Sequence, residues 1–121
     1  LDPKKIKLGI APIGWTNDDM PELGGNIPFE RCIAEMAEAK FQGTEVGSKF
    51  PKEPNALKKA LAPHKLQIAS QWFSAFFTTQ PDPNPTIEAF KKHMEFLKAM
   101  GAKVVVRSEE HTSELQSPNT I

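Results

Sequence analysis

The chain has 121 residues, 39% apolar and 25% charged, and its 15 basic and 15 acidic side chains give a formal net charge of zero. This is ordinary globular composition, and the balanced charge argues against a nucleic-acid-binding surface that depends on many uncompensated phosphate contacts. No stretch approaches the roughly 20 consecutive apolar residues of a membrane span. We therefore expect a cytoplasmic protein that binds neither nucleic acid nor membrane. The lone cysteine, Cys32, excludes an internal disulfide framework.

The first half of the chain alternates strand and helix signals. Residues 6–13 form an apolar, β-branched run that predicts a strand. Turn-forming residues dominate positions 15–26, which predicts a polar loop. An apolar stripe at helical spacing follows Pro28 and predicts a helix that ends before Gly43. A β-branched core between two glycines predicts a brief buried strand over residues 43–47.

The second half repeats the pattern. Residues 54–64 carry leucines on one helical face and lysines on another, which predicts a short helix. Residues 66–73 predict a third strand, and a Pro-rich loop leads to a long helix that begins near Asn84 and ends at Gly101. Residues 103–106 begin a fourth strand. The predicted core stripe of the last helix comprises Ile87, Phe90, Met94 and Leu97.

The predicted order is β-α-β-α-β-α-β, which implies parallel strands joined by right-handed crossovers. A doubly wound sheet and a (β/α)8 barrel both fit this order. The dinucleotide-binding version of the doubly wound sheet carries G-x-G-x-x-G after its first strand, and that spacing does not occur here. The barrel is therefore favoured. Since a complete barrel needs roughly 250 residues, the predicted fold over residues 1–106 is the N-terminal half of a TIM barrel.

The last segment, residues 107–121, has no apolar period of a helix or a strand. All eleven residues of RSEEHTSELQS match the in-frame translation of a common sequencing-library adapter, which favours a disordered, non-native tail. Its glutamates and His111 then have no evolved role. Without it, residues 1–106 carry 14 basic and 12 acidic side chains, a formal charge of +2. The alternative is a natural polar terminus. Sequencing the source DNA across the codon for Val106 distinguishes the two origins.

Polar and aromatic residues follow the predicted strand ends. In a parallel barrel, ligands meet the loops at the C-terminal ends of the strands. An indole ring beside amides and carboxylates is typical of a sugar or polyol site, because the ring covers C–H faces while polar groups meet hydroxyls. The residues selected in this way are Trp15, Thr16, Asn17, Asp18, Asp19, Glu45, Lys49, Gln71 and Trp72.

Several of these residues also have a purely structural interpretation. Asp18 and Asp19 are equally typical of turns and helix caps, and Trp72 is a natural core residue. Glu45 is more specific, because an acidic side chain on a short, otherwise apolar strand needs a partner or a function to offset its desolvation.

Signals for metal binding or nucleophilic catalysis are weak. His64 suits the C-terminal end of its helix, where the helix dipole favours a basic residue, and His93 lies on a polar helix face among charged residues. Both are interpreted as surface residues, and Cys32 as a small packing residue. The sequence shows neither a Ser-His-Asp arrangement nor a phosphate-binding P-loop.

Residues from about Lys7 to Val106 contain four distinctive stretches: GIAPIGWTNDD, MPELGGNIPFE, GTEVGSKFP and QIASQWF. In these stretches the chain resembles the inosose dehydratases (myo-inosose-2 dehydratases) of myo-inositol catabolism, within the xylose-isomerase-like barrel superfamily. The resemblance implies a hydro-lyase that removes water from 2-keto-myo-inositol (scyllo-inosose) to give a trihydroxycyclohexane-1,2-dione. It also implies a divalent metal, manganese or cobalt, and an association with glutathione.

In this superfamily the metal ligands come from strands in the second half of the barrel, so the resemblance implies no metal ligand in this chain. It implies substrate-facing roles, assigned by position and without individual catalytic roles. The residues concerned are Trp15, Asn17, Asp18, Glu45, Lys49, Gln71 and Trp72. Because half a barrel leaves two open strand edges, we expect the isolated chain to be inactive and either unfolded, aggregated or self-associated as a homo-oligomer.

Two other functions remain open at this stage. A keto-sugar or sugar-phosphate isomerase or epimerase on the same barrel would share metal and enediolate chemistry. A non-catalytic fragment that binds polyols or copies of itself belongs to a different class.

Overall fold

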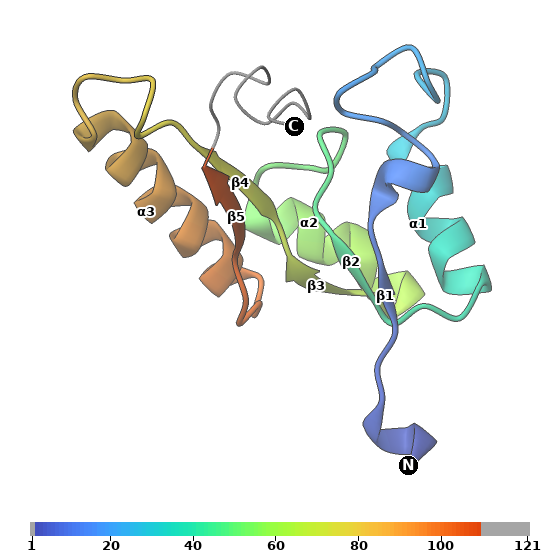
Figure 1. Ribbon diagram of the computed structural model, residues 1–121. Coiled ribbons are helices and arrows are strands. Elements are labelled where there is room, and N and C mark those ends of the chain that lie inside the picture. Colours follow the sequence, from blue (N-terminus) through green and yellow to red (C-terminus); the bar gives the residue numbers. More distant parts are fainter. Residues whose placement is uncertain (1, 110–121) are drawn as a thin grey trace, which may run out of the picture.

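The computed structural model describes residues 2–109. These residues form an α/β structure in which helices and strands alternate, except that two strands, β3 and β4, follow each other directly (Figure 1). The strands are β1 (Gly9–Ile10), β2 (Gly43–Glu45), β3 (Gln67–Ser70), β4 (Trp72–Ala75) and β5 (Val106–Glu109). The helices are α1 (Phe29–Glu38), α2 (Pro54–Leu61) and α3 (Asn84–Ala99), with short 3-10 helices η1 (Pro3–Lys5), η2 (Pro12–Gly14) and η3 (Ala62–His64).

All strand pairs in the described residues are parallel. One sheet has the order β1-β2-β3, and a second sheet pairs β4 with β5. The single strand predicted over residues 66–73 is in fact two strands, because Gln71 interrupts the ladder. β3 pairs with β2 on one side, whereas β4 pairs with β5 on the other. Consecutive strands thus link the two sheets.

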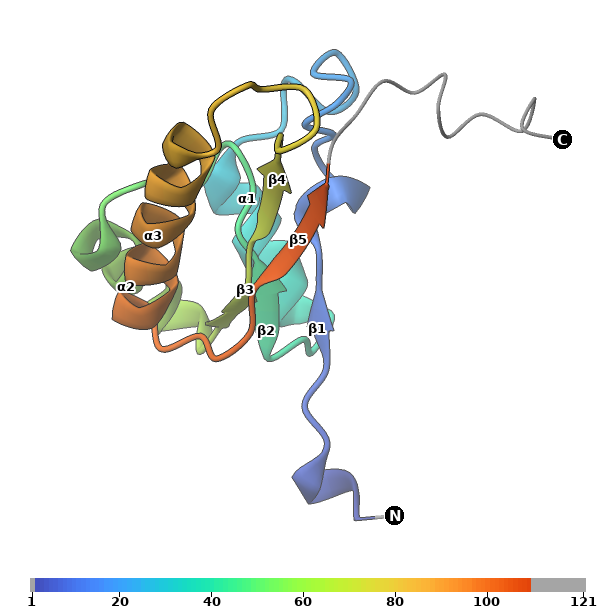
Figure 2. The same ribbon diagram turned by 60° about the vertical axis from the view of Figure 1, so that its left-hand side comes forward.

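The helices α1, α2 and α3 lie on one side of the strands, and the opposite side carries no α-helix within residues 2–109 (Figure 2). The loops after β1, β2 and β4 all lie at the same end of the molecule, the upper end in Figure 1. This is the C-terminal end of the parallel strands, where a barrel binds its ligands. No helix of residues 2–109 is long and apolar enough to cross a membrane.

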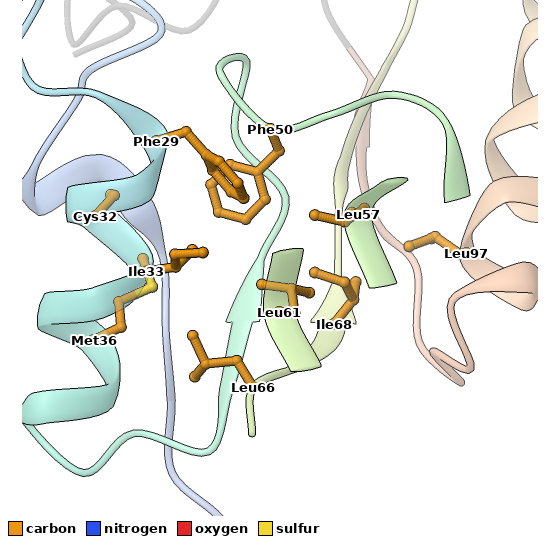
Figure 3. Packing of buried hydrophobic residues seen from close by; sticks show 10 residues of the cluster. All are labelled: Phe29, Cys32, Ile33, Met36, Phe50, Leu57, Leu61, Leu66, Ile68 and Leu97. Atoms are coloured by element: carbon orange, nitrogen blue, oxygen red, sulfur yellow. The ribbon is translucent and has the colours of Figure 1, made fainter. Parts of the chain in front are cut away.

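The hydrophobic core lies between the helices and the strands (Figure 3). Phe29 of α1 and Phe50 of the β2–α2 loop contact each other edge to face, with ring centroids 4.7 Å apart. The fully buried side chains Met36 and Leu57 come from α1 and α2, and Ile68 of β3 joins them. The amphipathic stripes of the sequence therefore meet in one cluster that fixes the helices on the strands.

The predicted core stripe of α3 is only partly correct. Leu97 is buried, but Ile87 and Met94 are exposed. The helix instead turns Phe90 and His93 toward Phe73, with ring centroids 5.1 Å apart in both pairs. The sequence spacing places apolar residues on two adjacent faces of α3. The face that packs is the one that lies against β4.

The first strand is shorter than predicted. β1 covers only Gly9–Ile10, and Pro12–Gly14 form a 3-10 helix instead of continuing the strand. Pro12 lies in the first turn of that helix. Backbone N–H groups there have no partner within the helix, so the missing N–H of proline costs no hydrogen bond.

The fourth strand is displaced toward the C-terminus and crosses the predicted boundary between residues 106 and 107. The strand predicted to begin within residues 103–106 begins only at Val106, and residues 107–109 of the predicted tail continue it as the rest of β5. A parallel ladder uses backbone groups, which any sequence supplies. In addition, the Glu109 carboxylate accepts hydrogen bonds from Phe77 N, Thr78 N and Thr78 Oγ1 at 2.8–3.3 Å. Residues 110–121 lie outside the described range, and the adapter origin stays a prediction.

Candidate functional site

A cavity of about 610 Å³ opens at the C-terminal ends of the strands. It brings together residues that are far apart in sequence: Asn17, Asp18 and Asp19 from the loop after β1, Glu45 from β2 and Trp72 from β4. Thr16 also lines it. Three carboxyl groups, an amide and an indole ring therefore line one space, which offers hydrogen-bonding groups beside an aromatic face.

A second cavity of about 660 Å³ lies beside the first. Its wall includes Gln71 and three basic side chains: Lys52, Lys92 and His93. Asp18 and Trp72 line both cavities and so lie at the boundary between them. The ionisable side chains that line the first cavity are all acidic, whereas those of the second cavity are basic apart from Asp18.

The loop after β1 holds its polar side chains through turn contacts. The Asn17 Oδ1 atom accepts hydrogen bonds from Asp19 N at 2.9 Å and Met20 N at 3.1 Å. Its carbonyl is thus used in the turn, which leaves its amide N–H groups as donors toward the cavity. Asp18 accepts from Ser48 N at 3.1 Å and Ser48 Oγ at 2.5 Å. Turn formation and cavity lining therefore coincide in the same two residues.

Glu45 lies at the last position of β2 and is half-buried against the first cavity. Within residues 2–109 its carboxylate has no hydrogen bond or ion pair with another side chain. A carboxylate has several acceptor sites, which are open to a ligand when no protein donor occupies them. This placement favours a role for Glu45 as a hydrogen-bond acceptor for a ligand.

Trp72 is 54% exposed, so the interpretation of this residue as a core side chain is wrong for this structure. Its indole Nε1–H donates to Ser74 Oγ at 3.1 Å. Gln71, between β3 and β4, lines the second cavity, and its backbone carbonyl accepts from His93 Nε2 at 3.1 Å. The break in the strand therefore places two neighbouring residues at the cavities.

Trp15 and Lys49 line neither cavity. The Trp15 indole Nε1–H donates to Glu35 Oε2 of α1 at 2.6 Å, and its ring packs against the core. The Lys49 ammonium donates to the carbonyls of Gly24, Gly25 and Ile27 at 2.6–3.1 Å. Both residues hold the loop after β1 instead of facing the cavity, because each finds acceptors nearer than the open space.

Glu35 links Trp15 to Arg31. The Arg31 guanidinium donates to Glu35 Oε1 at 2.9 Å, and this hydrogen bond, followed by that from Trp15, lowers the pKa of the Glu35 carboxyl below its usual value. A lowered pKa means that the native state favours the ionised form. The Arg31–Glu35 pair is solvent-exposed, so screening by water and salt reduces its contribution to the stability of the fold.

We expect the Glu35 contribution to stability to be complete at neutral pH and to be lost as the pH falls through the lowered pKa. The reason is that the unfolded chain takes up a proton at a higher pH than the folded chain does. Unfolding titrations of the protein and of Glu35→Gln between neutral and acidic pH measure this. The stability difference between the two should shrink on acidification, and a difference that grows would contradict the assignment.

Sequence reasoning missed His93, which it placed on a solvated helix face. The side chain is half-buried, contacts Phe73 and lines the second cavity. Its position three residues after Phe90 could have indicated this, because residues at that spacing share a helix face, and the face of Phe90 packs on β4. His64 is half-buried near the end of α2, away from both cavities.

Cys32 packs in the core as expected from its place beside the apolar stripe of α1. Burial, and then the nearby Glu35 carboxylate, raise the pKa of its thiol. A buried thiol with a raised pKa is a poor nucleophile. Within residues 2–109, no group of three or more histidine, cysteine, aspartate or glutamate side chains could hold a metal ion. The described residues therefore do not fit a complete metal site.

Comparison with known proteins shows which enzymes this chain is similar to. The chain is 63% identical over 109 residues to an inosose dehydratase from Geobacillus thermodenitrificans (strain NG80-2), an alignment covering 90% of this chain and 36% of that protein. It is 55% identical over 121 residues to an inosose dehydratase from Clostridium beijerinckii, covering 98% of this chain and 40% of the relative. The chain is homologous to the inosose dehydratases. No family model matches it.

The chain spans little more than a third of the length of these inosose dehydratases. A structural comparison supports the fold. The crystal structure of a probable 3-DHS dehydratase from Bacillus anthracis aligns with a TM-score of 0.58 and 14% identity, covering 84% of this chain and 38% of that one. That structure has a TIM-barrel-type fold, and the predicted fold class, an incomplete (β/α)8 barrel, is confirmed.

Proposed function

We propose that this chain forms the substrate-binding end of part of an enzyme that dehydrates 2-keto-myo-inositol to a trihydroxycyclohexane-1,2-dione. The observation that carries the proposal is the 55–63% identity to inosose dehydratases over nearly the whole chain. The cavity at the strand ends supports it, because its side chains suit a ring that carries several hydroxyl groups. We further propose a cytoplasmic location, which the absence of cysteine pairs in the sequence favours.

The residues of the first cavity divide the recognition of such a ring between them. The carboxylates of Asp18 and Glu45 accept hydrogen bonds from ring hydroxyls, and the Asn17 amide donates to a hydroxyl or ketone oxygen. The exposed Trp72 indole covers one C–H face of the ring. Hydrogen bonds to ionised carboxylates are the stronger kind, so Asp18 and Glu45 contribute most to affinity.

The reaction removes a proton from the carbon next to the ketone and a hydroxyl from the adjacent carbon, and together these leave as water. A base accepts the proton and an acid protonates the departing hydroxyl. We assign neither role to a residue of this chain. Manganese or cobalt has no complete site among residues 2–109. Like glutathione, the metal stays a prediction from the family resemblance.

The test uses a chimera in which residues 7–106 replace the matched segment of the Geobacillus thermodenitrificans inosose dehydratase. In this chimera, Glu45→Gln and Asp18→Asn keep the size of each side chain but remove its charge. We expect each to lower kcat/KM for 2-keto-myo-inositol about tenfold or more, because hydrogen bonds to a charged acceptor are lost. Turnover is followed by mass spectrometry as loss of one water.

The matched control is Glu38→Gln, which removes a carboxylate from the exposed end of α1, away from both cavities. It should leave kcat/KM unchanged. If Glu45→Gln and Asp18→Asn behave like this control, then the cavity at the strand ends does not bind the substrate.

A further inference from the structure

Two neighbouring residues in the β2–α2 loop hold the loop that follows β1. Ser48 contacts the first half of that loop, since both of its hydrogen-bond donors reach the Asp18 carboxylate. Its backbone N–H donates to Oδ2 at 3.1 Å and its hydroxyl donates to Oδ1 at 2.5 Å. Each carboxylate oxygen thus has one partner, and together the two bonds fix both the position and the rotation of the Asp18 carboxylate.

Lys49 contacts the second half of the same loop. Its ammonium group has three donors, and they meet the carbonyl oxygens of Gly24 at 3.0 Å, Gly25 at 3.1 Å and Ile27 at 2.6 Å. The positive charge of the ammonium offsets the repulsion between the three carbonyl dipoles and so stabilises their convergence on one point. This leaves Lys49 without a donor for a ligand.

From these contacts we infer that Ser48 and Lys49 are positioning residues that set the orientation of Asp18 at the boundary between the two cavities. The inference rests on the proposed function. Lys49 lines neither cavity, and Ser48, which lies at the wall of the second cavity, spends both of its donors on Asp18. Ser48 orients the carboxylate directly, and Lys49 acts through the backbone of residues 24–27.

The geometry of the loop supports this role. Its beginning is held at α1 by the hydrogen bond between Trp15 and Glu35, and its end by Lys49. Asp18 lies between these points and lines both cavities. A binding residue held at this place gains from a fixed orientation, because a side chain that is already ordered loses less conformational entropy when the ligand binds.

The experiment compares Ser48→Ala, Ser48→Thr and Lys49→Met in the chimera. We expect Ser48→Ala and Lys49→Met to raise KM for 2-keto-myo-inositol about tenfold while kcat changes much less, because uniform binding is lost. Ser48→Thr keeps the hydroxyl and should restore most of the affinity. Amide hydrogen exchange provides a second readout: the N–H groups of Asp19, Met20 and Ile27 should exchange faster in both disruptive variants.

Lys59→Met removes a lysine from the exposed face of α2 and is the matched control, with no expected change in KM or exchange. Unchanged exchange in Ser48→Ala and Lys49→Met would overturn the inference, as would faster exchange with an unchanged KM. An unsubstituted chimera without turnover would instead contradict the proposed function, and the exchange measurement would still decide whether Ser48 and Lys49 hold the loop.

Discussion

Leu57→Ala in the chimera should lower the free energy of unfolding by roughly 2–5 kcal/mol, the range for a buried leucine that leaves a cavity. Leu57 is completely buried on α2, within the cluster that also holds Met36 of α1 and Ile68 of β3. The space left by the lost methyl groups lies between three elements whose backbones are fixed by hydrogen bonds, so it can close only in part. Urea unfolding followed by circular dichroism measures the loss.

Leu23→Ala is the matched control, because Leu23 is 52% exposed in the loop after β1. Exposed substitutions of this kind usually change stability by no more than about 0.5 kcal/mol. Equal losses for the two variants would mean that α2 does not pack on the strands as described.

Gly24→Ala should disrupt the loop after β1 and reduce activity of the chimera toward 2-keto-myo-inositol. Gly24 has a φ of +76°, a left-handed conformation that costs other residues roughly 1–2 kcal/mol. An added Cβ would also lie 1.8 Å from the Trp15 carbonyl oxygen, so the backbone must move. Since the Gly24 carbonyl is one of the Lys49 acceptors, that movement reaches the contacts that hold Asp18.

Gly14→Ala provides the control, because no atom lies within 4 Å of the Cβ that would be added there. We expect kcat/KM to fall at least about tenfold for Gly24→Ala and to stay unchanged for Gly14→Ala. A fully active Gly24→Ala protein would show that the conformation of this loop does not matter to the site.

Most of the order of elements was predictable from the sequence, because each α-helix carries an amphipathic stripe and the segments around β1 and β3 are short apolar runs. The predictions that were wrong concern features that depend on contacts between segments far apart in the sequence. Ile87 and Met94 fit a helical stripe as well as Phe90 does, and only the position of β4 selects Phe90. Val106–Glu109 form a strand because the backbone of β4 is free to pair with them, which no side-chain pattern encodes.

The candidate site was predictable to the same degree. The rule that ligands meet the C-terminal strand ends places Asn17, Asp18, Glu45 and Trp72 at one cavity. It could not show that Trp15 and Lys49 point elsewhere, because both follow strand ends equally well. Their partners, Glu35 and the carbonyls of residues 24–27, are found only once the loop is folded.

Steady-state turnover of 2-keto-myo-inositol by the unsubstituted chimera tests the central proposal most directly. Residues 7–106 should support dehydration with a kcat/KM within about tenfold of that of the Geobacillus thermodenitrificans enzyme, since the replaced segment supplies the same kind of substrate contacts. Circular dichroism and thermal unfolding establish that the chimera is folded. A folded chimera that releases no water from 2-keto-myo-inositol would contradict the assignment of this chain to inosose dehydration.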